Sequence, residues 1–324
     1  MSARDSILVT GGAGFVGSHF ARAACDAGSR VTVLDDLSAG TMPAFRDEVT
    51  FVRGDIADRA LVAKILREHG ITAIAHFAGK IQVGESVKKP QLYFDGNLTK
   101  SLALLDAVLE APVPFLFSST AAVYGMPDEI PILETARKEP INPYGASKLA
   151  IEHALDAYGT AHGLRWGALR YFNAAGAHPD GTLREGHDPE THLIPLVIDA
   201  ALGRRPPLSI FGDDYPTPDG TCIRDYIHVL DLASAHLAAL DALDAGVAVR
   251  AVNLGSGSGF SVREVIDEAA RVIGTPVPFT MGPRREGDPA VLLASNGRAR
   301  EVLGWTPQRS ELATVIGDAV RSRS

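Results

Sequence analysis

Short apolar runs alternate with longer amphipathic stretches through the first half of the chain. The apolar runs have the length and composition of buried strands, and we expect strands at 6–10, 30–35, 49–55, 73–79, 114–119 and 166–173. The stretches between them predict helices at 15–28, 57–70, 93–110 and 146–163. Because strands and helices alternate and the strands are almost continuously apolar, the predicted fold class is α/β, a doubly wound parallel sheet of the Rossmann type.

The pattern changes after Asn173. Residues 176–192 are polar and predict a loop, and the rest of the chain mixes turn-rich sequence with shorter periodic runs. Those runs predict helices at 193–203, 231–243 and 261–274 and a strand at 251–257. We therefore expect a smaller α/β substrate-binding domain. The expected division assigns 1–176 with 226–256 to the sheet domain, and 177–225 with 257–324 to the smaller one.

Composition narrows the class of partner. The chain has 324 residues, of which 46% are hydrophobic, and its net charge of −8 disfavours nucleic acid. No apolar run is long enough to cross a bilayer, and the start MSARDSILVTGG leaves no room for a signal peptide, so we expect a cytoplasmic protein without a membrane partner. The two cysteines, Cys25 and Cys222, lack the spacing of a metal site, and no metal is expected.

A glycine-rich turn follows the first predicted strand. Gly11, Gly14 and Gly17 permit a tight turn and a close approach of the backbone to a diphosphate, which would lie at the amino end of the next helix, beside Phe15 and Val16. The order strand, glycine turn, helix is typical of a dinucleotide site, although the spacing G-x-x-G-x-x-G differs from that of simpler dehydrogenases.

Acidic residues close the next two strands. Asp35 and Asp36 stand at the distance expected for a carboxylate that accepts hydrogen bonds from the adenosine ribose and repels a 2′-phosphate. This position favours NAD over NADP as the cofactor, and the regeneration of NAD within each cycle described below would keep it tightly bound. Asp55 and Ile56 are suited to the adenine, although an aspartate after a strand is also a common helix cap.

The segment NPYGASK places Tyr144 four residues before Lys148, so both side chains share one helix face. A lysine ammonium beside a tyrosine favours the phenolate, which can act as the base that an alcohol oxidation needs. A hydroxyl from Ser118, Ser119 or Thr120, at the end of the preceding strand, would bond to the same substrate oxygen. The spacing alone also fits a solvated helix face, but behind a dinucleotide fold the catalytic interpretation is favoured.

Seven motifs in order now carry a family resemblance: TGGAGFVG, HFAGKIQVGESV, FSSTAAVYG, NPYGASK, LRYFNAAGAH, DGTCIRDYIHVLDLA and RREGDPA. They span almost the whole chain, which resembles the extended short-chain dehydrogenase/reductases and, among them, the nucleotide-sugar 4-epimerases. The resemblance implies that Tyr144 is the base, Lys148 its electrostatic partner and Thr120 the hydroxyl. It implies that the NAD also contacts Phe77, Ala78, Gly79, Lys80, Asn97, Ser118 and Tyr171.

The same resemblance implies a UDP-hexose substrate in the smaller domain. The guanidinium groups of Arg224 and Arg285 would clamp the diphosphate, a task that suits bidentate donors. The other substrate contacts that it implies are Asn173, His192, Leu193, Asp288 and Leu292. Lys80 follows HFAG one position early, and His192 stands where an asparagine is common, so the contacts of both are open. It further implies a homodimer through the helices at 93–110 and 146–163.

Two positions bear on the reaction and the sugar. Related 4,6-dehydratases carry an Asp-Glu pair after the threonine, whereas this chain has Ala121 and Ala122, which cannot move the protons of an elimination. Dehydration is therefore disfavoured, and the resemblance implies interconversion of UDP-glucose and UDP-galactose by oxidation at C4, rotation of the 4-keto sugar and re-reduction. Leu292, where some relatives carry a tyrosine, predicts that 2-acetamido sugars also fit.

Two alternatives to this function stay open. One is a 4-epimerase for another nucleotide sugar, such as UDP-glucuronate or UDP-xylose, which would use the same machinery. The other is a non-catalytic NAD-binding regulator, which would keep the glycine turn and Asp35. A regulator has no need for Tyr144, Lys148 and Thr120 together, and their presence argues against it.

Overall fold

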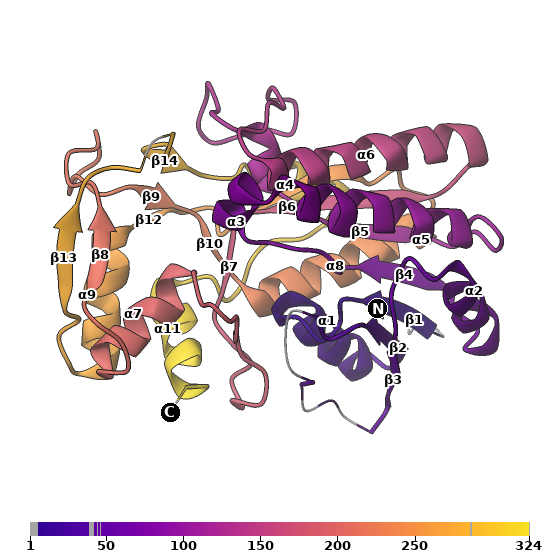
Figure 1. Ribbon diagram of the computed structural model, residues 1–324, viewed down its shortest axis with the longest axis horizontal. Coiled ribbons are helices and arrows are strands. Elements are labelled where there is room, and N and C mark those ends of the chain that lie inside the picture. The colour runs from indigo at the N-terminus through magenta and orange to yellow at the C-terminus, as the bar shows by residue number, and fades with distance from the viewer. Residues whose placement is uncertain (1–5, 39–41, 44, 46, 286, 324) are drawn as a thin grey trace.

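A parallel sheet of seven strands forms the larger part of the molecule (Figure 1). The computed structural model describes residues 6–38, 42–43, 45, 47–285 and 287–323. The strand order is β11-β6-β5-β4-β1-β2-β3, and every neighbouring pair is parallel. This confirms the predicted doubly wound α/β fold. The strands are β1 (Ser6–Thr10), β2 (Arg30–Asp35), β3 (Val49–Arg53), β4 (Ala73–His76), β5 (Phe115–Thr120), β6 (Trp166–Tyr171) and β11 (Arg250–Leu254).

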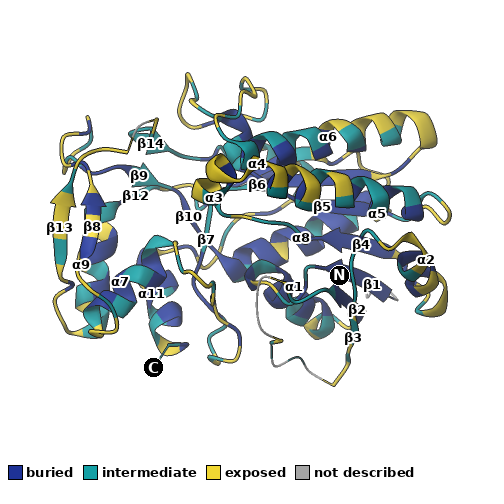
Figure 2. Cartoon of the chain, in the orientation of Figure 1, coloured by how far each residue is buried: buried dark blue, intermediate teal, exposed yellow. Residues whose placement is uncertain are grey.

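Helices cover both faces of this sheet, because alternate strand residues point to opposite sides. Ile7 and Val9 pack with α1 (Phe15–Asp26) and α8 (Val229–Asp244), whereas Leu8 packs with the helices of the other face. Those helices are α2 (Arg59–Glu68), α5 (Lys100–Val108) and α6 (Pro143–His162). The sheet is buried between the two layers, and the outer sides of the helices are exposed (Figure 2).

The predicted helix at 93–110 is interrupted in the structure. Its residues form the end of α4 (Pro90–Tyr93), a π-helical turn η1 (Phe94–Thr99) and α5. The wider turn fits the position of Asn97, whose side chain bonds to the backbone of another loop, and π-helical turns commonly occur at functional sites. Before this segment lies α3 (Val83–Lys88), and after β5 comes the 3₁₀ turn η2 (Ala121–Tyr124).

The second half of the chain builds a smaller α/β region with its own apolar core. Its helices are α7 (Leu193–Ala201), α9 (Val262–Ile273) and α11 (Leu312–Arg321), while α10 (Gly297–Leu303) packs back toward the large sheet. The predicted strand at 166–173 ends at Tyr171, and a separate β7 (Asn173–Ala175) pairs with β10 (Tyr226–His228). The remaining strands are β8 (Leu208–Phe211), β9 (Ile223–Arg224), β12 (Phe260–Ser261), β13 (Phe279–Gly282) and β14 (Val291–Leu292).

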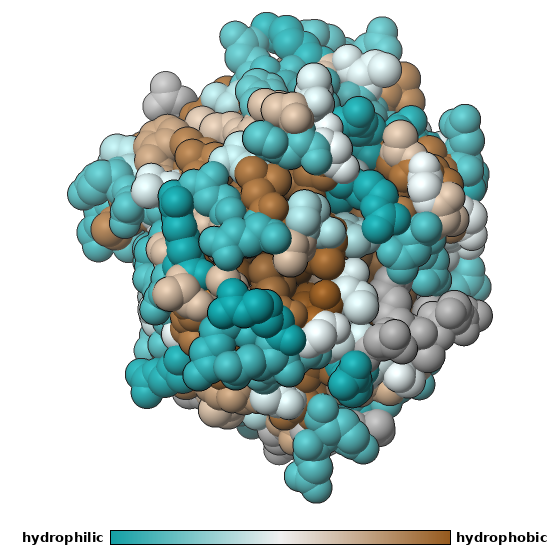
Figure 3. Space-filling model, turned by 90° about the vertical axis from the view of Figure 1, so that its right-hand side faces the viewer, coloured by the Kyte–Doolittle hydropathy of each residue, from teal (hydrophilic) through white to brown (hydrophobic). Residues whose placement is uncertain are grey.

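The parallel pair β8–β13 was not predicted, since its two strands are short and lie about seventy residues apart. Beside it, β9 is flanked by β12 and β14. Seen from the side that carries α2, the surface is mostly hydrophilic, with hydrophobic residues gathered near its centre (Figure 3). Within the described residues, no helix is long and apolar enough to cross a membrane.

Candidate active site

The glycine turn joins β1 to α1 in very little space. Gly11 has a φ of +69°, and a Cβ atom built there would lie 2.3 Å from the backbone nitrogen of Ala78. A Cβ at Gly17 would lie 2.3 Å from the carbonyl oxygen of Gly11, so neither position accepts a side chain. Gly14 precedes α1, whose first turn is capped by no side chain. These first amide groups are therefore donors for an anionic group, with Phe15 buried beneath them.

The carboxylate of Asp35 is fixed at the edge of this turn. Its two oxygens accept hydrogen bonds from the backbone nitrogens of Ala13, at 2.9 Å, and Leu37, at 2.8 Å. Asp36 accepts one from the backbone nitrogen of Ser38. The structure thus holds Asp35 beside the helix start that follows the turn, where its charge would meet a ribose and oppose a phosphate.

The predicted adenine residues have partners within the protein. Asp55 forms an ion pair with Lys100, whose Nζ lies 2.6 Å from a carboxylate oxygen. Burial raises the pKa of Asp55, but the hydrogen bond from Lys100 and one from the backbone of Ala57 outweigh it, and the net shift is downward. Ile56 is buried in the core beneath the sheet. Ile56 thus contributes to packing whether or not it also borders an adenine.

Tyr144 stands in the first turn of α6 because the local sequence starts the helix there. The side chain of Asn142 accepts a hydrogen bond from the backbone nitrogen of Gly145 at 2.9 Å, and Pro143 takes the first helical position. Lys148, one turn later, donates from Nζ to the carbonyl oxygen of Ser118 at 2.9 Å. Thr120, the last residue of β5, makes a side-chain hydrogen bond with Tyr144. The structure therefore brings the predicted pair and the predicted hydroxyl together.

Burial sets the electrostatics of this group. It raises the pKa of Tyr144, which the hydrogen bond from Thr120 partly offsets, and it lowers the pKa of Lys148 to about 8. Lys148 is only 2% exposed, and its Nζ lies 4.8 Å from the centre of the Phe117 ring. The hydroxyl of Tyr171 is 2.5 Å from the side-chain oxygen of Ser118, next to the carbonyl that Lys148 contacts.

Asn97 holds the loop that follows β4. Its side-chain oxygen accepts from the backbone nitrogen of Lys80 at 2.7 Å, and its amide donates to the carbonyl of Lys80 and to the hydroxyl of Ser147. A Cβ at Gly79 would come within 3.0 Å of Asn97 and 3.6 Å of the Lys148 Nζ. Since Gly11 lies against Ala78, this loop connects the glycine turn to the Tyr144–Lys148 pair. Asn97 thus stabilises the backbone of this loop through hydrogen bonds to Lys80.

Most of the predicted substrate residues surround β9. Arg224, on β9, forms an ion pair with Asp288, and Leu292 lies directly opposite Arg224 in the neighbouring strand. Leu292 also packs against the small apolar cluster that contains the buried Tyr124, close in sequence to Thr120. The side-chain amide of Asn173 donates to the backbone oxygen of the residue after Arg224 at 2.9 Å.

Two of the predicted substrate residues, His192 and Leu193, lie away from β9. A neighbour of a third, Arg285, was not predicted. His192 precedes α7, where it contacts Glu185, and Leu193 begins that helix and packs into the core of the smaller region. The guanidinium of Arg285 lies 4.0 Å from the centre of the Phe211 ring. Phe211 was not predicted; the signal was a half-exposed aromatic residue at the end of a short apolar run, SIF.

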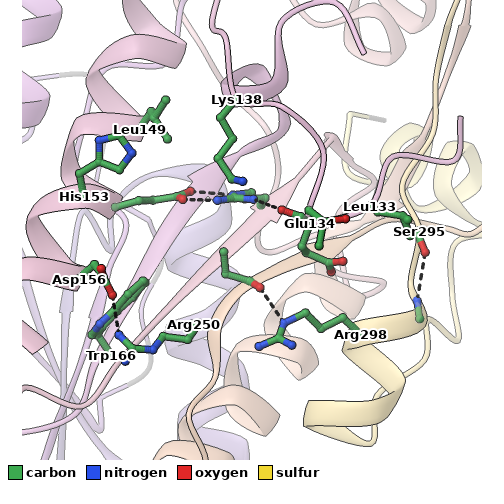
Figure 4. A pocket seen from close by; sticks show the side chains of 15 residues that line it. Leu133, Glu134, Lys138, Leu149, His153, Asp156, Trp166, Arg250, Ser295 and Arg298 are labelled. Carbon is green, nitrogen blue, oxygen red and sulfur yellow. Dashed lines mark hydrogen bonds and ion pairs between the residues drawn. The ribbon is translucent and has the colours of Figure 1, made fainter. Parts of the chain in front are cut away.

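A cleft of about 790 Å³ lies on the side of α6 that faces away from the loop after β4. The residues that line this cleft were not predicted from the sequence. Figure 4 shows its wall, where Arg250 reaches Asp156. Deeper in the wall, the guanidinium of Arg170 forms a buried ion pair with Glu152. Glu152 also accepts a hydrogen bond from Ser119 at 2.5 Å, so this ion pair supports the strand that ends at Thr120.

The fold and the site together define the class. The protein combines a doubly wound sheet, a glycine turn and an acidic residue at the end of the second strand. A Tyr-x-x-x-Lys pair stands at the start of α6, beside the end of β5. This is the arrangement of an NAD-dependent extended short-chain dehydrogenase/reductase. The family model described as "NAD dependent epimerase/dehydratase family" matches residues 7–255, and the chain belongs to this family.

Relatives match over nearly the full length. The chain is 51% identical to a UDP-glucose 4-epimerase from Azospirillum brasilense, covering 98% of this chain and 92% of the relative. The structure of UDP-glucose 4-epimerase from Brucella ovis in complex with NAD superposes with a TM-score of 0.95 at 47% identity, covering 98% of both chains. The UDP-Glc/GlcNAc 4-epimerase from Campylobacter jejuni superposes with a TM-score of 0.87 at 40% identity, covering 99% of both.

Proposed function

We propose that this protein is a UDP-glucose 4-epimerase, which interconverts UDP-glucose and UDP-galactose with NAD as its cofactor. The observation that carries the proposal is the contact of Tyr144 with Thr120, with Lys148 buried one helical turn away and beside the loop that packs on the glycine turn. The relatives that match nearly the whole chain support the choice of reaction.

NAD fits the residues present. The crowding at Gly11 and Gly17 brings backbone rather than side chains to the first turn of α1, where uncapped amides suit a diphosphate. Asp35 is fixed beside them as an acceptor for ribose hydroxyls. NAD held by these residues would supply the hydride acceptor and donor for the sugar C4.

Tyr144 is the proposed base for the hydroxyl at C4. Its pKa is raised by burial in the protein alone, so it needs a positive charge nearby to hold a phenolate. Lys148 supplies that charge inside the protein, where the effective dielectric constant is low. Thr120, which lies beside Tyr144, is proposed to hydrogen-bond the same sugar oxygen. In the return step Tyr144 gives the proton back to that oxygen.

The groups around β9 are proposed to hold the UDP while the sugar turns over. Arg224 and Arg285 suit the diphosphate, Asn173 and Asp288 suit sugar hydroxyls, and the exposed ring of Phe211 suits a stacked base. Two faces of the sugar must in turn meet the same Tyr144. A substrate anchored through its nucleotide, with few strong contacts to the hexose, allows this rotation.

A wider sugar range is favoured by Leu292. This residue lies opposite Arg224, packs against the cluster that contains Tyr124, and carries no hydroxyl. The Campylobacter jejuni relative is described as acting on both Glc and GlcNAc forms, which supports the comparison. We therefore propose that UDP-N-acetylglucosamine is also accepted. Comparable kcat/KM values for the two sugars support this, and complete rejection of the acetylated sugar contradicts it.

The test of the main proposal uses the purified protein without added NAD. Incubation with UDP-galactose should yield UDP-glucose, identified by chromatography, because the cofactor is regenerated in each cycle and stays bound. Tyr144→Phe should lower kcat by about 10²–10⁴-fold and leave NAD binding unchanged. Tyr158→Phe, on the same helix but bonded to Asp106, is the matched control. Turnover of UDP-glucuronate or UDP-xylose alone would favour a sister specificity, and no turnover at all would favour a regulator.

We also propose a domain division, an oligomeric state and a cellular location for this protein. We infer that residues 1–176 with 226–256 form the NAD-binding domain and that 177–225 with 257–324 form the nucleotide-sugar-binding domain. The separate apolar core of the smaller region supports this division. We also infer a homodimer through the segments 93–110 and 146–163, and a cytoplasmic location.

A further inference from the structure

The loop between β7 and α7 gathers two carboxylates and two imidazoles at one point. Glu185, His187, Glu190 and His192 each offer one ligand atom, and these four atoms lie within 4.8 Å of one another. In the sequence they form E-x-H-x-x-E-x-H. No metal was expected from the sequence because Cys25 and Cys222 lack the spacing of a metal site. The E-x-H-x-x-E-x-H segment was not considered there.

The cluster is mostly enclosed by protein. The side chain of Glu185 is only 4% exposed, and the accessible fractions of His187 and Glu190 are 18% and 13%. The Nδ1 atoms of both histidines face one oxygen of Glu185, with His187 at 3.2 Å and His192 in closer contact. One buried carboxylate oxygen therefore lies beside both imidazole nitrogens.

The Nδ1 atom of His187 faces two carboxylates. It is buried and lies 3.2 Å from Glu185 and 3.6 Å from Glu190. A nitrogen that lies between two carboxylate oxygens can share a cation with them.

Glu190 has further partners within the protein. One oxygen of Glu190 accepts the backbone nitrogens of Thr191 and His192 at the start of α7, and Arg323 lies 3.5 Å from its other oxygen. Arg323 is itself shared with Asp199, at 3.1 Å. These contacts fix Glu190 in place beside the imidazoles.

We propose that Glu185, His187, Glu190 and His192 bind one divalent transition-metal ion, best matched by Zn²⁺. Two imidazole nitrogens and two carboxylate oxygens form the four-coordinate set that zinc accepts, at ligand distances of about 2.0–2.2 Å. With all four positions taken by protein, the site is structural. It joins the loop 176–192 to the first turn of α7. The proposal is independent of the enzyme's reaction.

The test is metal binding by the whole chain. The purified protein, freed of any tag, is dialysed against a chelator and then titrated with ZnCl₂ by calorimetry, and its zinc content is measured by mass spectrometry. We expect one Zn²⁺ per chain, and Co²⁺ in its place should give the visible absorption bands of a tetrahedral ion. Zn²⁺ should raise the Tm, because it binds the folded protein.

Variants locate the site. His187→Gln should weaken Zn²⁺ binding by at least about tenfold, and His192→Gln, at a more exposed position, should do the same and carries the test if the first variant does not fold. His162→Gln, at the exposed end of α6, is the matched control and should bind like the unchanged protein. The proposal is overturned if the unchanged protein takes up no zinc, or if both cluster variants bind it as tightly as the control.

Discussion

Lys148 carries its charge almost entirely inside the protein. Among the residues that the structure describes, its ammonium has one hydrogen-bond acceptor, the carbonyl oxygen of Ser118, and burial lowers its pKa to about 8. A lysine on a solvated helix face would keep an ordinary pKa, so the structure favours the electrostatic role for this residue. The charge that supports a Tyr144 phenolate is then fully present only below that pH.

The buried lysine should be visible in the pH dependence of stability. Its pKa is about 8 when folded, against 10.5 for the ordinary value, so between these values the unfolded chain binds more protons. In that window the residue makes the free energy of unfolding rise with pH, whereas below pH 8 its full burial cost remains. Lys148→Met removes this contribution. The advantage of the variant in urea unfolding should shrink by about 2 kcal/mol between pH 7 and 9.5, and parallel profiles at equal NAD content would contradict it.

Leu292 is the residue on which sugar range is expected to depend. It packs against the small apolar cluster of Val123, Tyr124 and Ile132, and a tyrosine there would carry a bulkier ring and a hydroxyl. Leu292→Tyr should therefore reduce kcat/KM for UDP-N-acetylglucosamine by about 10–200-fold, because the larger side chain would crowd the acetamido group. The change for UDP-glucose should be smaller. The ratio of the two constants is the measurement, with UDP-glucose as the internal control. An unchanged ratio would place the sugar C2 elsewhere.

At the scale of elements, β5, β6 and α6 are joined by a buried ion pair. Ser119 lies opposite Arg170 in the β5–β6 pairing, and both contact Glu152 from α6. Arg170 also donates to the hydroxyl of Tyr124 at 2.7 Å, in the turn that follows Thr120. This network positions the end of β5 and, through it, Thr120.

Breaking this pair should be costly, whereas replacing both partners should be much less so. Glu152→Ala leaves the guanidinium of Arg170 buried without its partner, and we expect a loss of about 3–5 kcal/mol in the free energy of unfolding. The double variant Glu152→Leu with Arg170→Met removes both charges and should recover most of that loss. Denaturant titrations of the singles and the double form the test, and a double variant no more stable than Glu152→Ala would refute it.

At the scale of the whole molecule, α5 and α6 lie side by side on the outside of the sheet (Figure 1). Apolar residues of these segments remain half-buried in the single chain, among them Leu98, Leu102, Ala150 and Ala154. A second copy packed on the same helices would cover them, as the proposed homodimer requires.

The dimer is tested by light scattering during gel filtration. The unchanged protein should show about twice the chain mass of 34.2 kDa. Leu102→Glu places a charge in the proposed interface and should shift the protein toward the monomer. Leu133→Glu is the matched control, since Leu133 is exposed outside these helices. A monomeric unchanged protein, or equal masses for both variants, would exclude this interface.

The sheet was predicted well because its signals are local. Apolar runs marked β1, β2 and β5 within a residue of their observed bounds, and glycine positions marked the turn after β1. The prediction failed where distant contacts override periodicity. The π-helical turn in 94–99 depends on Asn97 meeting the backbone of Lys80, and β8 depends on pairing with β13.

The sequence by itself determined the order of strands and helices, the glycine turn, and the placement of Tyr144 and Lys148 on one helix face. Each follows from the spacing of neighbouring residues and from the small number of allowed backbone conformations. Only the tertiary structure decided that Lys148 is buried, that Arg224 pairs with Asp288, and how the Glu185–His192 cluster is oriented. Those features depend on which distant segments pack together, and on how much water the packing removes.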